Sequence, residues 1–166
     1  LLLGHLRPSA GRYLVNHTDT ARLNAATFRT RIAWCPQEGH LFDSTLRANL
    51  LLARPHDDAP SDDELEAVLG RVGLGPLPGR MPLGLASPIG SEGGALSGGE
   101  RQRLAVARTL LTRSDVILID ALLQGRVKGL ALVEQIRKAA HGVPVIVLTV
   151  PQNPIEPDPE RGIHGV

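Results

Sequence analysis

Aromatic residues are scarce in this chain of 166 residues: they make up 2% of it and all lie within the first 42 positions. Because proteins that hold single-stranded nucleic acid stack its bases on aromatic side chains, this scarcity argues against such a platform. The formal net charge is only +1, so bulk charge provides no attraction to nucleic acid or to a lipid surface. We therefore expect no nucleic-acid partner.

The chain has a single cysteine and no long apolar run. The single Cys35 excludes an internal disulfide and a multi-cysteine zinc site, and its apolar neighbours predict a small core side chain. The sequence contains no run of 18 apolar residues, so we expect no transmembrane helix. Hydrophobic residues nevertheless make up 42% of the chain. A chain of this length can bury about 70% of its unfolded surface, which is enough for one sizeable core.

The most informative motif is Leu96-Ser97-Gly98-Gly99-Glu100, followed by Arg101-Gln102-Arg103. Ser97 is a favourable helix N-cap, and its hydroxyl can also donate to a phosphate. Gly98 and Gly99 let the backbone approach a ligand without interference from a Cβ atom. Good helix formers follow, and the N-terminus of a helix attracts anions. Taken alone, the motif also fits a Ser-Gly-Gly turn that caps an ordinary amphipathic helix.

Two further segments flank this motif in the sequence. Ile32 to Cys35 predicts a buried strand, which Pro36 ends because proline cannot donate to a ladder. Gln37 then lies at the carboxyl end of that strand, where open α/β sheets bind ligands. Asp115 to Asp120 contains four consecutive apolar residues, which is typical of a strand covered on both faces. Its terminal Asp120 is placed to hold magnesium through water.

Together these segments resemble the nucleotide-binding domain of ABC transporters over residues 1–150. The stretch His40 to Leu50 is more similar to exporters than to importers, and in particular to the exporters of bacterial cytochrome bd assembly, which move thiols. The resemblance implies an α/β fold with a P-loop NTPase-like, RecA-like parallel sheet and an inserted helical subdomain.

The same resemblance divides the chain into units. Residues 1–44 and 97–150 would form an incomplete core that lacks the first P-loop strand. Residues 45–96 would form the helical subdomain, because two helical patterns and several breaks lie there. The tail 151–166 contains four prolines and is expected to be disordered.

The resemblance also assigns roles to the motif residues. The signature loop would contact an ATP molecule held by the opposing subunit, and it comprises Ser97, Gly98, Gly99 and Glu100. Gln37, in the Q-loop, and Asp120, in the Walker B position, would hold Mg²⁺ when a nucleotide is present. The implied cofactors are ATP and Mg²⁺. The implied partners are a second ABC nucleotide-binding domain and the transmembrane domain of an exporter, with the chain cytoplasmic and peripheral on the inner face of the cell membrane.

The sequence departs from the family at positions that carry catalysis. It contains no G-x-x-x-x-G-K-[ST] motif, the loop whose backbone and lysine hold nucleotide phosphates. Leu1 to Gly11 resembles the end of the helix that follows this loop, so the chain is expected to begin a few residues too late. Ala121 stands where the family has the glutamate that polarises the attacking water, and Val150 where it has the switch histidine. Loss of a general base lowers a rate roughly 10²–10⁴-fold, so no catalytic residue is assigned.

We therefore expect a fragment of an exporter nucleotide-binding domain that cannot hydrolyse ATP alone. Three alternatives stay open: an ordinary transporter subunit whose remaining part lies outside this chain, a non-catalytic partner that supplies its LSGGE loop to an intact ABC subunit, and a decayed pseudo-ATPase scaffold. A chromosome-maintenance ATPase shares the LSGG motif. It is excluded because the segment between Gln37 and Ser97 has no room for a long coiled coil.

Local patterns complete the expected secondary structure. We expect strands at 12–16, 31–35, 115–120 and 145–149. In the first half of the chain we expect a helix from an Asn24 cap to Arg29, and a helical segment from Ser44 that breaks at Pro55 and Pro60. We then expect a helix from a Ser61 capping box, a loop over 76–96, a helix after Ser97 and an amphipathic helix over 128–140.

Overall fold

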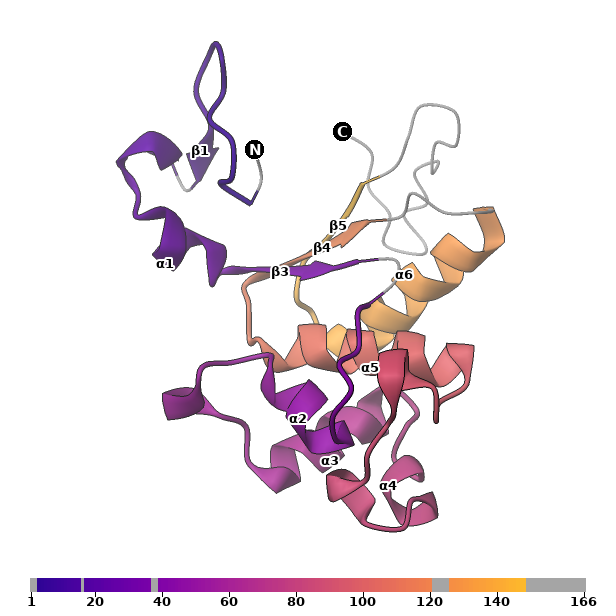
Figure 1. The fold of residues 1–166 in the computed structure, drawn as a ribbon. Helices are drawn as coiled ribbons and strands as arrows, with labels where there is room; N and C mark the ends of the chain where they lie inside the picture. Colours follow the sequence, from indigo (N-terminus) through magenta and orange to yellow (C-terminus); the bar gives the residue numbers. More distant parts are fainter. Residues whose placement is uncertain (1–2, 16, 37–38, 121–125, 149–166) are drawn as a thin grey trace.

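The computed structural model describes residues 3–15, 17–36, 39–120 and 126–148 (Figure 1). Within them, the strands are β1 (Leu14–Val15), β2 (Thr18–Asp19), β3 (Ile32–Cys35), β4 (Val116–Asp120) and β5 (Val145–Leu148). The α-helices are α1 (Ala25–Arg29), α2 (Leu46–Leu51), α3 (Asp62–Arg71), α4 (Leu77–Arg80), α5 (Gly98–Leu111) and α6 (Arg126–Ala140). Short 3₁₀ turns lie at Thr20–Arg22, His56–Asp58, Gly84–Ala86 and Ser91–Gly93.

The central sheet is parallel, with strand order β3-β4-β5. Figure 1 shows α5 and α6 together on one side of it. Residues of β3 and β4 on that side, such as Cys35 and Ile119, join one buried cluster with Leu104 of α5 and Ile136 of α6. The parallel sheet and the helices that cover it confirm the α/β class predicted from the sequence.

The other face of the sheet is only partly covered. Trp34, Leu118 and Ile146 stand side by side on this face, because they are register partners in β3, β4 and β5. Leu118 is buried, whereas Trp34 is 51% exposed and Ile146 43% exposed. The prediction of a buried strand over Ile32 to Cys35 is therefore wrong for one face of β3. Trp34 is exposed because the described helices α5 and α6 lie together on the opposite side of the sheet (Figure 1).

Two helices of the segment between β3 and α5 pack against α5. Helix α2 contributes Leu46 and Leu50, and α3 contributes Leu65 and Leu69, all fully buried. These side chains repeat at helical spacing on one face of each helix. The Nε atom of Arg71, at the end of α3, donates to the carbonyl oxygen of Ala139 in α6 at 2.9 Å. The helical segment is thus attached to both helices that cover the sheet.

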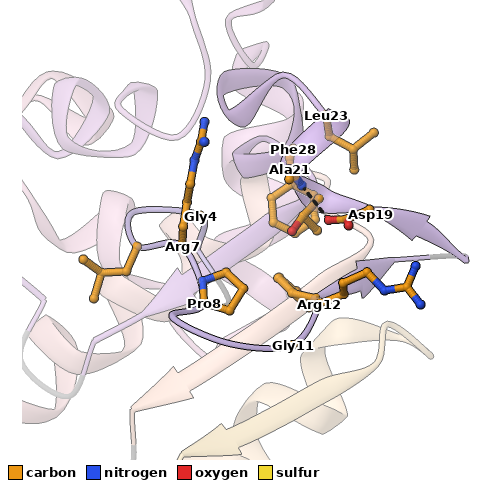
Figure 2. Close-up of a pocket in the computed structure, with 12 residues that line it drawn as sticks. Gly4, Arg7, Pro8, Gly11, Arg12, Asp19, Ala21, Leu23 and Phe28 are labelled. Atoms are coloured by element: carbon orange, nitrogen blue, oxygen red, sulfur yellow. Dashed lines mark hydrogen bonds between the residues drawn. The ribbon is translucent and has the colours of Figure 1, made fainter.

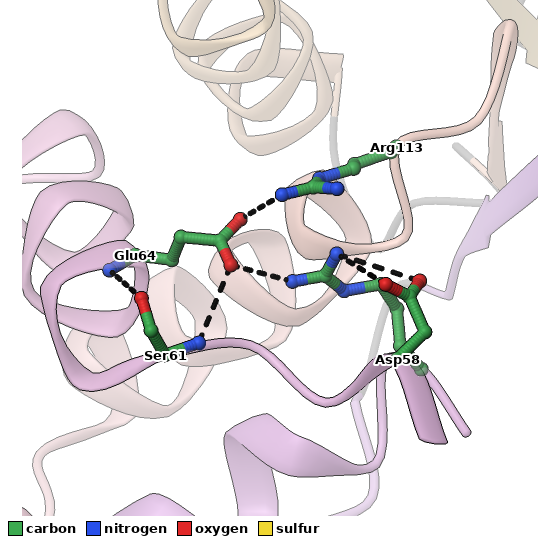
Figure 3. A network of polar contacts seen from close by, with 5 residues as sticks. Asp58, Ser61, Glu64 and Arg113 are labelled. Carbon is green, nitrogen blue, oxygen red and sulfur yellow. Dashed lines mark hydrogen bonds and ion pairs between the residues drawn. The ribbon is translucent and has the colours of Figure 1, made fainter. Parts of the chain in front are cut away.

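A polar network fixes the start of α3 (Figure 3). Ser61 and Glu64 form the predicted capping box. The guanidinium of Arg54, which is 5% exposed, donates to Glu64 Oε2 at 2.9 Å and to Asp58 Oδ1 at 3.4 Å. Arg113, in the loop between α5 and β4, pairs with the other oxygen of Glu64. Hydrogen bonds from Arg113 and Arg54 lower the pKa of Glu64. Because Arg113 follows α5, its contact with Glu64 links the start of α3 to the end of α5.

Several local predictions need correction. The expected strand at 12–16 is shorter and pairs antiparallel with β2, which the pattern did not indicate. The expected loop over 76–96 contains α4 and two 3₁₀ turns. Its prolines do not prevent helix α4, because Pro76 and Pro78 lie where a helix has no use for a backbone N–H. The helices expected after Asn24, Ser44, Ser61 and Ser97 are confirmed, as is α6, which begins two residues earlier than expected.

The boundaries of the units at 1–44, 45–96 and 97–150 stay a proposal, and the tail 151–166 lies outside the described residues. Over the part of the chain that is described, no helix is both long and apolar enough to cross a membrane.

Candidate functional site

The site begins at the N-terminus of α5. Ser97 has an extended backbone and acts as the N-cap, as its sequence position predicted. Its Oγ accepts the backbone N–H of Glu100 at 3.3 Å, and the Glu100 carboxylate accepts the backbone N–H of Ser97 at 2.9 Å. This reciprocal pair is a capping box, which satisfies two backbone donors that a helix leaves unpaired.

The carboxylate of Glu100 makes two further contacts. The Ser97 hydroxyl donates to Glu100 Oε2 at 2.8 Å, and Arg80, at the end of α4, donates from Nη2 to Glu100 Oε1 at 2.7 Å. The backbone of Ser97, its hydroxyl and then Arg80 lower the pKa of Glu100 from 4.5 to about 2. Glu100 is therefore a charged group at neutral pH, and it lies where the helix dipole stabilises anions.

Gly98 and Gly99 form the first turn of α5 and are exposed. Neither has a left-handed backbone, and a Cβ built at Gly98 or Gly99 comes no closer than 3.9 Å or 3.5 Å to the arginine side chains beside it. Packing among the described residues therefore does not require either glycine. Glycine within a helix costs about 1 kcal/mol relative to alanine. The approach of a group from outside the chain would explain why both positions lack a side chain.

The segment that follows β3 lies directly against α5. A Cβ built at Gly39 would be 2.2 Å from the Cβ of Ala105, so only glycine fits there without movement. Gln37 itself lies outside the described residues. Whether it meets the magnesium position assigned from the sequence therefore stays a prediction.

The continuation of this segment is fastened by a buried asparagine. Asn49 of α2 accepts the Phe42 N–H at 2.9 Å, and its amide donates to the carbonyl oxygens of Phe42 and Thr45 at 3.0 Å each. The ring of Phe42 stays 51% exposed and contacts His40 edge-to-face. Asn49 has no assigned role in the sequence motifs, although a buried asparagine on an apolar helix is a signal for such a clamp.

Asp120 is the last residue of β4, the central strand, and it is the register partner of Leu148 in β5. The residue before it, Ile119, is the register partner of Cys35, the last residue of β3. The carboxyl ends of β3 and β4 therefore meet at one edge of the sheet. The side chain of Asp120, and residues Ala121 and Val150, lie outside what the structure describes. Among the described side chains, no group of three His, Cys, Asp or Glu residues is placed to hold a metal ion.

A cavity of about 220 Å³ lies elsewhere, between residues 4–13 and residues 19–28 (Figure 2). Arg7, Arg12, Asp19 and Phe28 are among its lining residues. The sequence assigned no site residue to this part of the chain, and the cavity contains none of the motif residues.

Comparison with known proteins identifies the family. The sequence profile described as "ABC transporter" matches residues 1–123. The glutathione/L-cysteine transport system ATP-binding/permease protein CydC of Escherichia coli is 45% identical over 71% of this chain and 20% of that protein. The mycobactin import ATP-binding/permease protein IrtB of Mycolicibacterium smegmatis is 38% identical over 72% of this chain and 20% of that protein.

A solved structure agrees with these relatives. A bacterial Atm1-family ABC exporter with ATP bound superimposes with a TM-score of 0.71 and 29% identity, covering 90% of this chain and 26% of that one. The chain thus spans about a fifth of the curated relatives named above and a quarter of the exporter of known structure. The chain therefore belongs to the ABC transporter family, as part of the ATP-binding domain of an exporter-type member.

Proposed function

We propose that this chain presents the loop from Ser97 to Glu100 to the phosphates of an ATP molecule held by a second nucleotide-binding domain. The observation that carries the proposal is the pair of exposed glycines, Gly98 and Gly99, which no internal contact requires.

The chemistry of the loop suits an anion. The hydrogen-bond ladder of α5 includes the Arg101 N–H, which donates to the Ser97 carbonyl at 2.9 Å. The amides of Gly98 and Gly99 precede that bond and are donors at the positive end of the helix. A helix N-terminus stabilises a negative charge by roughly 0.3–1 kcal/mol. The Ser97 hydroxyl, which now donates to Glu100, would turn to a phosphate oxygen, while the Glu100 carboxylate keeps the backbone N–H of Ser97.

Magnesium belongs to the same proposal. Asp120 and Gln37 offer carboxylate and amide oxygens, the hard ligands that Mg²⁺ prefers, so the donor set fits the ion. Bound with ATP, Mg²⁺ neutralises phosphate charge. These two residues would hold it only when a nucleotide occupies the chain's own side of the interface.

We further propose the transmembrane domain of an exporter as the second partner, with the chain at the cytoplasmic face of the cell membrane. Asn49 binds the backbone of Phe42, next to the Q-loop segment, and the ring of Phe42 is exposed. This exposed ring would be an apolar contact for that partner. The names of the relatives, which are ATP-binding/permease proteins, support this arrangement. The 45% identity to a glutathione/L-cysteine transport protein supports a small thiol as the transported class.

The experiment mixes the purified chain with a half-exporter from the same genome that contains an intact G-x-x-x-x-G-K-[ST] loop, and measures ATP hydrolysis by that partner. The wild-type chain should change the rate, and Ser97→Arg should abolish the change because its side chain blocks the loop. Ser91→Arg, at an exposed serine outside the loop, is the matched control and should act like wild type. Equal behaviour of wild type and Ser97→Arg, including no effect from either, would favour a decayed scaffold and refute the proposal.

A further inference from the structure

Arg80 lies beside the signature loop although it precedes Glu100 by 20 residues. It ends helix α4, a turn that the sequence pattern did not predict. Its guanidinium Nη2 donates to Glu100 Oε1 at 2.7 Å, and the side chain is 64% exposed, whereas that of Glu100 is 15% exposed. An exposed cation from another helix thus holds the less accessible anion of the loop.

The position of this anion creates a conflict for an ATP-contacting loop. Glu100 is ionised at neutral pH, since its pKa lies at about 2. Its Oε2 accepts both the N–H and the hydroxyl of Ser97, and the hydroxyl is a donor that a phosphate would also use. A phosphate that approached Gly98 and Gly99 would therefore meet a like charge within a few ångströms, where repulsion is appreciable at a protein surface.

We propose that Arg80 is a positioning residue of the ATP-contacting loop: it draws Glu100 Oε1 toward α4 and offsets the negative charge of Glu100 against the phosphates. This inference rests on the proposed function of the loop. Arg80 acts through Glu100, so its effect should depend on a negative charge at position 100.

That dependence gives a double-mutant cycle. Arg80→Ala should raise the concentration of chain needed for half of its maximal effect on the partner's ATP hydrolysis by about fivefold, the upper range for a partly exposed ion pair. Arg80→Lys keeps the charge and should recover most of the loss. Glu100→Gln removes the charge but keeps an acceptor for the Ser97 N–H. In that background, Arg80→Ala should change the half-effect concentration less than about twofold, because coupled residues are not additive.

The test titrates each variant into the same half-exporter with Mg-ATP as the probe. Arg137→Ala, at an exposed arginine of α6, is the matched control and should behave like wild type. Thermal unfolding of each variant shows that the fold is intact. If wild type does not affect the partner, the proposed function and this inference fail together. If wild type acts but Arg80→Ala acts equally, or loses the same factor in the Glu100→Gln background, the inference on Arg80 alone is overturned.

Discussion

Replacing Gly39 with alanine should push the segment after β3 away from helix α5. The new Cβ would lie 2.2 Å from the Cβ of Ala105 and 3.4 Å from its Cα. Carbon atoms in contact are about 3.5–4.0 Å apart, so the two Cβ atoms must separate by roughly 1.5 Å. Such overpacking typically costs about 1–3 kcal/mol. For a protein of this size, each kcal/mol lowers Tm by about 2–4 °C.

The assay is thermal unfolding followed by circular dichroism, with a double-mutant cycle to isolate the clash. Ala105→Gly alone should cost about 1 kcal/mol, because glycine weakens the middle of a helix. In the Gly39→Ala background, the same change should cost less or restore stability, since it removes one of the two clashing methyl groups. Gly70→Ala, in α3, is the control: a Cβ at this position would meet nothing within 4 Å beyond its chain neighbours and the helix backbone, so the variant should be as stable as wild type or more so. The steric explanation is wrong if Gly39→Ala melts like wild type or if the two changes are additive.

Further predictions concern the clamp, the loop and the reaction. Asn49→Ala should lower the free energy of unfolding by about 2 kcal/mol, measured by urea titration, because it leaves the Phe42 N–H and two carbonyls without their side-chain partner; unchanged stability would show that water replaces the clamp. The folded-state pKa of Glu100, about 2, lies below its ordinary 4.5. The contribution of ionised Glu100 to the free energy of unfolding is therefore complete above pH 4.5 and is lost as the pH falls toward 2. Urea titrations at several pH values should show a weaker pH dependence for Glu100→Gln, and parallel profiles for the two proteins would contradict this prediction. The chain alone should not turn over Mg-ATP at about 1 s⁻¹ or faster, an ordinary enzyme rate, in a phosphate-release assay, and such turnover would refute the assignment of no catalytic residue.

Local signals in the sequence predicted the elements that depend on neighbours along the chain. Asn24, Ser61 and Ser97 are side chains that bond the amides just after them, so each marks a helix start regardless of the rest of the fold. Leu65 and Leu69 mark the buried face of α3 for the same reason, since helical spacing alone places them together.

Contacts between distant segments were beyond such signals. The half-exposed Trp34 sits in an apolar run, and only the arrangement of α5 and α6 shows which face of β3 is covered. Arg80 pairs with Glu100 across a turn whose prolines suggested a loop. Gly39 is an ordinary glycine in sequence, and its role becomes visible only where Ala105 approaches it. The family resemblance identified the signature residues, but not the residues that contact and position them, such as Arg80.

Contact between the loop from Ser97 to Glu100 and the phosphates of an ATP bound to another subunit can be tested directly. The most direct measurement loads an intact half-exporter with an ATP analogue that carries a photoreactive group on its γ-phosphate, adds this chain, irradiates, and maps the labelled peptides by mass spectrometry. If the loop contacts the phosphates, this chain should be labelled at the α5 N-terminus, and the labelling should be competed by ATP and lost in Ser97→Arg. Labelling confined to the partner, or labelling of this chain that Ser97→Arg leaves unchanged, would contradict it.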